Sequence, residues 1–189
     1  GRRTPERMSI SPNGNVIYGW NVLTAPADIL RIPVNQDGTF GQLTESPYHG
    51  DFPGGTIVYA DGQNALVTDQ AGIVFDGTTL LYRGATGGPI NDTAVYNGNR
   101  YALHRTYVSR LDSSFRETGV IPLTGEANAI AAYGSSLFLF RNSDTAASVE
   151  IVPFAAFDHP LATAPAADPA TTPFVADFVD LADDGIIYL

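Results

Sequence analysis

The amino-acid sequence predicts an all-β protein, and three observations lead to that fold class. Apolar residues make up 44% of the 189-residue chain and charged residues only 16%, which is unlike a helical bundle, whose exposed faces are rich in charged side chains. Glycine (19) and proline (13) interrupt the chain every few residues, as turns between short strands do. A hairpin-like unit also recurs along the chain.

The recurring unit is an apolar segment, a turn built on glycine and a second apolar segment. Its turn glycines are Gly14, Gly62, Gly98, Gly134 and Gly185, and their separations are 48, 36, 36 and 51 residues. All but Gly134 follow Asn or Asp, and these dipeptides supply the positive φ angles that tight hairpin turns require. The predicted hairpins are residues 9–20, 57–68, 93–104, 130–140 and 179–189.

A second hairpin follows the first in three of the units, at residues 28–43, 72–83 and 107–121, and a single strand follows in the fourth, at residues 148–154. Four short strands in about 36 residues make one blade of a β-propeller. The second strand of each unit, such as residues 137–140 (LFLF), is apolar on both faces, as when sheets stack on one another. We therefore expect about 4.5 blades, with a two-sheet sandwich as the second choice.

Residues 11–18 (SPNGNVIY) carry a resemblance to a known class of protein. They resemble bacterial β-propellers of the YVTN and lactonase-like type, in which a Ser-Pro-Asp-Gly turn joins the first two strands of a blade. As a repeat pattern the resemblance covers most of residues 9–157. It implies the propeller fold, and the first unit is the one that keeps the Ser-Pro pair.

Domain organisation follows from where the repeat is interrupted. Residues 1–157 are expected to form blades one to four, and the Pro- and Ala-rich residues 158–173 a linker or long loop. Residues 174–189 then begin a further blade. The rest of a longer chain or a second copy would complete the ring; alternatively, residues 174–181 supply the fourth strand of a four-bladed ring.

Charge and cysteine content exclude several functions. The net charge is −10 and all ten basic residues are arginine, so a basic nucleic-acid footprint and docking on anionic lipid are not expected. The chain has no cysteine, which excludes disulfides and thiolate chemistry. No apolar run approaches the roughly 20 residues of a membrane span, so membrane insertion is not expected. A cysteine-free chain fits an exported bacterial protein, located extracellularly, at the cell surface or in the periplasm.

Ligands of propellers bind mostly at one rim, formed by the loop after the second strand and the loop between blades. The first unit is longest in these two loops, at residues 21–27 and 44–55. Polar and aromatic residues of this rim are the candidate binding residues, with loop packing and solvated turns as the alternative interpretation. The candidates are Trp20, Asn21, Tyr48, His49, Asp51, Phe52, Asp69, Arg105 and Arg141.

No catalytic or metal-ligating set is predicted. His49, His104 and His159 lack the spacing of metal ligands, His104 is expected to be a structural histidine, and no zinc-protease, nucleophile-elbow or P-loop motif occurs. Calcium is suggested only by residues 35–38 (NQDG) and 183–185 (DDG), which serve equally well as turns.

Three functions remain open after these exclusions. The first is a non-catalytic binding or scaffolding module that recognises protein or carbohydrate through its rim loops. The second is a lactonase-like or other hydrolytic propeller enzyme with a metal in its central channel. The third is a purely structural half-propeller that pairs with a second chain or copy.

Overall fold

The structure is a computed structural model in which residues 8–21, 28–48, 58–62, 64–68, 71–142, 146–158, 170–172, 180–181 and 187–188 are described. The chain divides into two compact units, which are considered separately. Unit 1 comprises Gly1–Ile90 with Ser113–Arg116, and unit 2 comprises Asn91–Asp112 with Glu117–Leu189.

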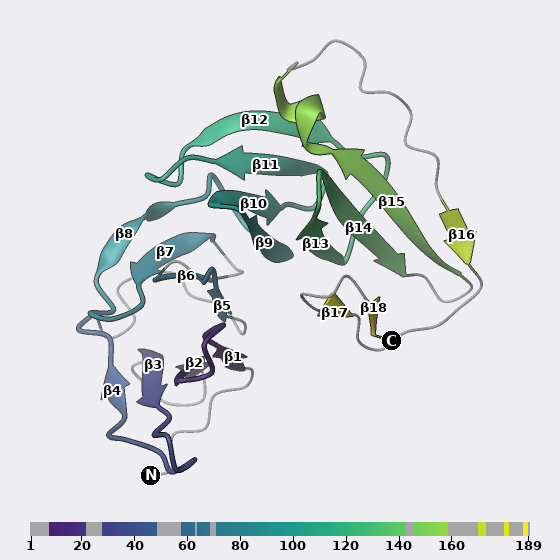
Figure 1. Cartoon of the computed structure of the whole chain (residues 1–189). Coiled ribbons are helices and arrows are strands. Elements are labelled where there is room, and N and C mark those ends of the chain that lie inside the picture. The colour runs from purple at the N-terminus through teal and green to yellow at the C-terminus, as the bar shows by residue number, and fades with distance from the viewer. Residues whose placement is uncertain are drawn as a thin grey trace. The chain divides into compact units, whose positions relative to one another are not determined.

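Unit 1 contains two four-stranded antiparallel sheets, each with its strands in chain order (Figure 1). The first sheet consists of β1 (Met8–Ile10), β2 (Val16–Asn21), β3 (Asp28–Pro33) and β4 (Thr44–Glu45). The second consists of β5 (Val58–Ala60), β6 (Ala65–Thr68), β7 (Ile73–Asp76) and β8 (Tyr82–Ala85).

Unit 2 also contains two four-stranded antiparallel sheets with strands in chain order. One consists of β9 (Asp92–Tyr96), β10 (Asn99–Leu103), β11 (Tyr107–Leu111) and β12 (Glu117–Pro122). The other consists of β13 (Ala129–Tyr133), β14 (Ser136–Asn142), β15 (Ala147–Pro153) and β16 (Ala170–Thr172). A 3-10 helix, η1 (Phe154–Asp158), follows β15, and β17 (Asp180–Leu181) pairs with β18 (Ile187–Tyr188).

The predicted fold class is confirmed: the sheets are the four-stranded antiparallel blades of a β-propeller. The first hairpin of each sheet is the one expected from the repeat, and its turn glycine has a positive φ: 71° at Gly14, 74° at Gly62, 78° at Gly98 and 61° at Gly134. A side chain is strained at such a φ, which explains why glycine recurs there. Gly185 lies outside the described residues.

Two strands differ in position from the expectation. The fourth strand of the first sheet is β4, just beyond residues 28–43, because residues 34–40 form a turn that a bridge between Val34 and Phe40 closes. The fourth strand of the last sheet is β16, inside residues 158–173 and before residues 174–181. Its Ala-Thr-Thr sequence lies between two prolines and retains the backbone donors and acceptors with which the edge of β15 pairs.

The core of unit 1 lies between its two sheets. Val16, Tyr18 and Trp20 project from one face of β2 and pack against Leu66 and Phe75 of the second sheet. All four residues of β6 are buried, so this strand is covered on both faces, as its apolar sequence predicts.

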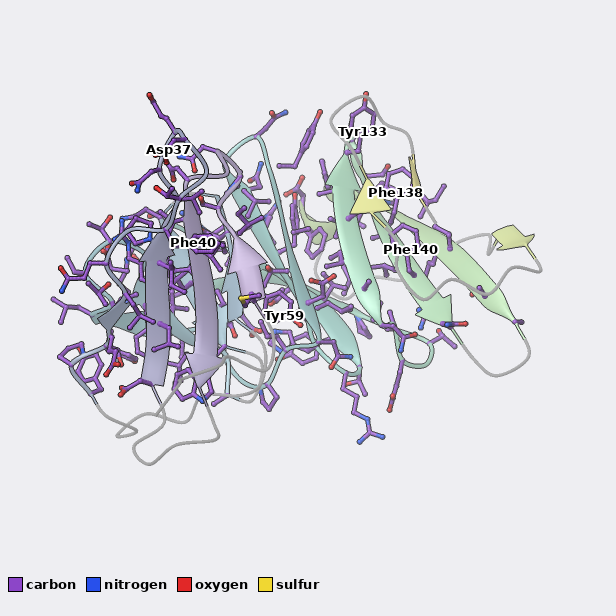
Figure 2. All side chains as sticks on the ribbon, turned by 90° about the horizontal axis from the view of Figure 1, so that it is seen from below. Asp37, Phe40, Tyr59, Tyr133, Phe138 and Phe140 are labelled. Carbon is purple, nitrogen blue, oxygen red and sulfur yellow. The ribbon has the colours of Figure 1, made fainter. Side chains whose placement is uncertain are left out.

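The core of unit 2 is also built from buried apolar side chains of its two sheets. Leu137 and Leu139 of β14 are fully buried, at 0% exposure. Tyr101 of β10 stacks on Phe154 with 5.2 Å between ring centroids, and its ring lies 5.4 Å from Phe157. The short helix η1 thus contributes two aromatic side chains, Phe154 and Phe157, to this core. Figure 2 shows Phe138 and Phe140 on the same strand as these leucines.

A side chain links the innermost strands of the two sheets in each unit. In unit 1, the Ser9 hydroxyl oxygen accepts a hydrogen bond from the backbone N–H of Ala60 at 3.2 Å. In unit 2, Asp92 Oδ2 accepts one from the N–H of Ile130 at 2.8 Å, and Asp92 Oδ1 accepts one from Thr93 at 2.8 Å. Burial raises the pKa of the Asp92 carboxyl to about 6 despite these hydrogen bonds.

Truncating a fully buried leucine of β14 should destabilise the fold strongly. Leu139→Ala leaves a cavity and should lower the free energy of unfolding by about 2–5 kcal/mol in urea denaturation. The matched control is Ile151→Ala on the neighbouring strand, where the side chain is 46% exposed and the expected loss is below about 1.5 kcal/mol. Equal losses for the two variants would contradict this account of the core.

Asp92 should make stability fall as the pH rises. Its pKa is raised from 3.8 to about 6 on folding, so the native state binds the proton more tightly than the unfolded chain does. Its contribution is therefore complete below pH 3.8 and is lost as the pH rises towards about 6. The stability of the wild type minus that of Asp92→Asn should decrease by on the order of 2–3 kcal/mol over this range in urea titrations.

Asp37 provides a control of opposite sign, because its hydrogen bonds lower the pKa of its carboxyl. The stability of the wild type minus that of Asp37→Asn should rise with pH. A difference for Asp92→Asn that stays constant or increases with pH would overturn the assignment.

Candidate functional site

Several of the predicted binding residues have a defined position in unit 1. Trp20 is 5% exposed and belongs to the core, so its ring is engaged in packing between sheets. Asn21 ends β2 and pairs with Asp28 of β3. His49, Asp51, Phe52 and Asp69 lie outside the described residues, and their part in binding stays a prediction.

Tyr48 packs against the second sheet of unit 1. Its hydroxyl oxygen accepts a hydrogen bond from the backbone N–H of Tyr82 at 2.9 Å, and its ring lies 6.2 Å from that of Phe75. These contacts attach the loop between the two sheets to β7 and β8, which is the packing role that the sequence left open as the alternative for this loop.

The remaining predicted residues, Arg105 and Arg141, lie in unit 2 at the end of the sheets expected to form the binding rim. Arg105 follows β10 and is paired with Glu126 on the loop that joins the two sheets. Both side chains are largely exposed, at 79% and 56%. An exposed pair of this kind adds little stability, so the two charges are available to a partner.

Arg141 holds the same loop in place. Its Nη1 group donates hydrogen bonds to the carbonyl oxygens of Gly125 at 2.9 Å and Glu126 at 2.8 Å, and its Nη2 group pairs with Glu150 of β15. The Arg141 and Glu150 side chains are mostly buried, with exposures of 19% and 21%. Arg141 therefore fixes the backbone of residues 123–128, and Arg105 and Glu126 form its exposed charged surface.

His104, also at this end of unit 2, is a buried side chain with several contacts. Its Nε2 atom lies 3.1 Å from the hydroxyl of Ser109 and 3.7 Å from Glu117, and its ring stacks on Tyr107 at 4.1 Å. Burial, together with the Glu117 carboxylate, raises the pKa of Tyr107. The surroundings are those of a structural histidine.

The turn at residues 35–38, considered above as a calcium loop, is closed by its own hydrogen bonds. Asp37 Oδ1 accepts from the N–H and hydroxyl of Thr39 at 3.0 and 2.6 Å, and these bonds lower the pKa of its carboxyl. Figure 2 shows Asp37 at this turn, near Phe40. Within the described ranges, no three side chains of His, Asp or Glu gather as a metal site would require.

A pocket that sequence reasoning missed lies between the two sheets of unit 1. It has a volume of about 440 Å³ and is bordered by the β1–β2 turn and the β5–β6 turn. Pro12 of the first turn approaches Gly62 of the second, where an added Cβ would lie 3.0 Å from Pro12 Cγ. Among the described residues that line it, Arg31 of β3 is the one with a charged side chain. The Ser-Pro-Asn-Gly turn was visible in the sequence, but its juxtaposition with residues about fifty positions later was not.

Tyr18 forms the inner wall of this pocket together with Arg31. The two residues are paired across β2 and β3, and the Tyr18 hydroxyl donates a hydrogen bond to the carbonyl of Gly77 at 2.9 Å. Burial raises the pKa of Tyr18, while the Arg31 guanidinium, which is hydrogen-bonded to the phenol, acts in the opposite direction. The phenol therefore stays protonated, with its O–H group donated to Gly77.

Comparison with known proteins gives the fold and no sequence family. No family model matches the chain, and no curated protein matches its sequence. The chain is similar to a structure of the COPII outer coat vertex on membranes (TM-score 0.64, 11% identity, 96% of this chain and 54% of the other). It is also similar to the WD40 domain of Pan2 from Neurospora crassa (0.57, 16%, 94% and 56%).

A chain of the nidogen–laminin complex is similar as well, with a TM-score of 0.52 and 12% identity over 76% of this chain and 58% of the other. The chain thus spans a little over half the length of each of these structures. At such identities the likeness concerns the fold: a β-propeller of repeated four-stranded blades. The described part of the chain holds no helix with the length and apolar character needed to cross a bilayer.

Removing Arg141 should release the loop that it holds. Arg141→Ala loses two hydrogen bonds to carbonyls and leaves the mostly buried Glu150 without this partner, so stability should fall by about 2–4 kcal/mol. Hydrogen exchange of the amides of residues 123–128 should accelerate at least several-fold. Arg105→Ala, which removes an exposed pair, should leave that exchange nearly unchanged. Unaltered exchange in Arg141→Ala would contradict the proposed role.

Proposed function

We propose that this chain is a non-catalytic β-propeller module of a secreted or cell-surface bacterial protein, of the YVTN type, that binds a protein or carbohydrate through its rim loops. The observation that carries the proposal is the loop of residues 123–128 in unit 2. Arg141 holds its backbone, and the loop presents the exposed Arg105–Glu126 pair. A surface that is rigid before binding loses less conformational entropy when a partner docks.

A protein partner is favoured by the character of this surface. Arg105 and Glu126 can each form an ion pair with an oppositely charged group of a partner instead of with each other. Such charge complementarity chiefly determines specificity and the association rate. Two of the similar structures are parts of protein assemblies, a laminin complex and a vesicle coat. This likeness in fold is consistent with a scaffold that presents loops to other proteins.

The test uses the labelled full chain on a peptide array and a glycan array. We expect hits on acidic or mixed-charge peptides that weaken at least tenfold in Arg105→Glu and decline with added salt. The matched control is Arg116→Glu, which reverses the charge of another exposed arginine. Hits on glycans alone would indicate a carbohydrate partner and would contradict a protein partner. No hits, or hits that Arg105→Glu leaves intact, would overturn the assignment of the site.

A further inference from the structure

The pocket of unit 1 has the size and lining of a small-molecule site. Its volume of about 440 Å³ lies within the range of known ligand pockets. Pro12, Val16 and Leu66 supply apolar surface, while Ser11, Asn15 and Thr78 supply hydroxyl and amide groups. The pocket lies at the end of the sheets that carries the β1–β2 and β5–β6 turns, and its lining residues all belong to unit 1.

Arg31 gives this pocket its charge. Although the chain carries a net charge of −10, no carboxylate lines the pocket among the described residues. Asp76, whose charge influences Tyr18, has its oxygens occupied by the N–H groups of Thr78 and Thr79, the Thr79 hydroxyl and the amide of Asn64. Among the described residues, Arg31 forms no ion pair.

The Nε–H group of Arg31 is buried and has no hydrogen-bond acceptor. A buried donor without an acceptor destabilises the empty pocket, and an incoming oxygen that accepts its hydrogen bond removes that cost. The guanidinium presents parallel N–H groups that match the two oxygens of a carboxylate. The Tyr18 hydroxyl lies beside it as a further polar group.

The remaining polar groups indicate what the rest of the ligand offers. The Ser11 hydroxyl donates to Asn13 Oδ1 at 2.8 Å, and Asn13 Oδ1 also accepts from the N–H of Asn15, so the turn is held by its own bonds. Such a turn keeps the Asn13 and Asn15 amides in fixed positions at the pocket. Amide groups that donate and accept hydrogen bonds suit a ligand rich in hydroxyls.

We propose that this pocket binds a small hydroxylated carboxylic acid of the sugar-acid class, with its carboxylate on Arg31 and its hydroxyls on the Asn13–Asn15 turn. The free acid and a terminal uronic acid residue of a polysaccharide carry the same chemistry. The site does not include any residue of the loop surface of unit 2. A negative result for one of the two proposals therefore leaves the other unaffected.

The test is calorimetric titration of the full chain with sodium D-glucuronate, with D-glucose as the neutral control of similar size. We expect measurable binding of glucuronate, weakened at least tenfold in Arg31→Gln, and none of glucose in the same range. Galacturonate and its trimer, compared with each other, distinguish the two sources: tighter binding of the trimer indicates a polysaccharide end, and binding of the monomer alone indicates the free acid.

A second variant keeps the test valid if Arg31→Gln fails to fold. Asn13→Asp retains both acceptor bonds of the turn and places a negative charge at the pocket, so glucuronate binding should weaken several-fold. Gln36→Asp adds the same charge at another exposed turn and should have no effect, as should Arg105→Gln. Absence of glucuronate binding, equal binding of glucose, or full binding by Asn13→Asp would overturn the proposal.

Discussion

Burial of the second strand of a sheet on both of its faces is the constraint on which this architecture depends. The four residues of β6 are all buried, and so are the consecutive residues Tyr101, Ala102 and Leu103 of β10. A strand without a solvent face cannot be stabilised by its own sheet alone, because that sheet covers only its edges. Each sheet therefore requires another sheet against it, and repetition of the blade is the simplest way to supply one.

Within the repeated sheets, few polar groups remain free to bind a ligand. Groups that can bind a ligand therefore lie at the ends of the sheets, in the turns and loops. Within a blade, antiparallel pairing satisfies the backbone, and the side chains between sheets are apolar or hydrogen-bonded. The two ends then differ in chemistry. The turn end of unit 1 carries a pocket lined by Arg31, which forms no ion pair with another described residue, whereas the loop end of unit 2 carries arginines that are paired with Glu126 and Glu150.

The sequence was most informative where structure is decided locally. Turn chemistry at Gly14, Gly62, Gly98 and Gly134, flanked by short apolar segments, located the first hairpin of every four-stranded sheet to within a few residues. Strand β16 was not predictable, because three residues between prolines carry no apolar pattern and gain their conformation from the edge of β15.

The candidate sites were less predictable than the fold, because they depend on contacts between distant residues. Arg141 was singled out by its place in the repeat. Its contacts with Glu150 and with the loop of residues 123–128 arise because β14 pairs with β15 on one side and with β13, which follows that loop, on the other. Trp20 looked like a rim residue and lies in the core. The Arg31 pocket requires two turns to meet, which no local pattern encodes.

The hydrogen bonds from Ala60 to Ser9 and from Ile130 to Asp92 bear on how such chains can be recombined. Each joins the innermost strand of one sheet to the backbone of the next, so a cut between the two sheets leaves an unmatched acceptor on one piece and an unmatched donor on the other. A gene segment that encodes a single blade would encode the donor or the acceptor of that hydrogen bond without its partner. In each unit, the smallest piece that can be transplanted with its polar groups intact is a pair of blades.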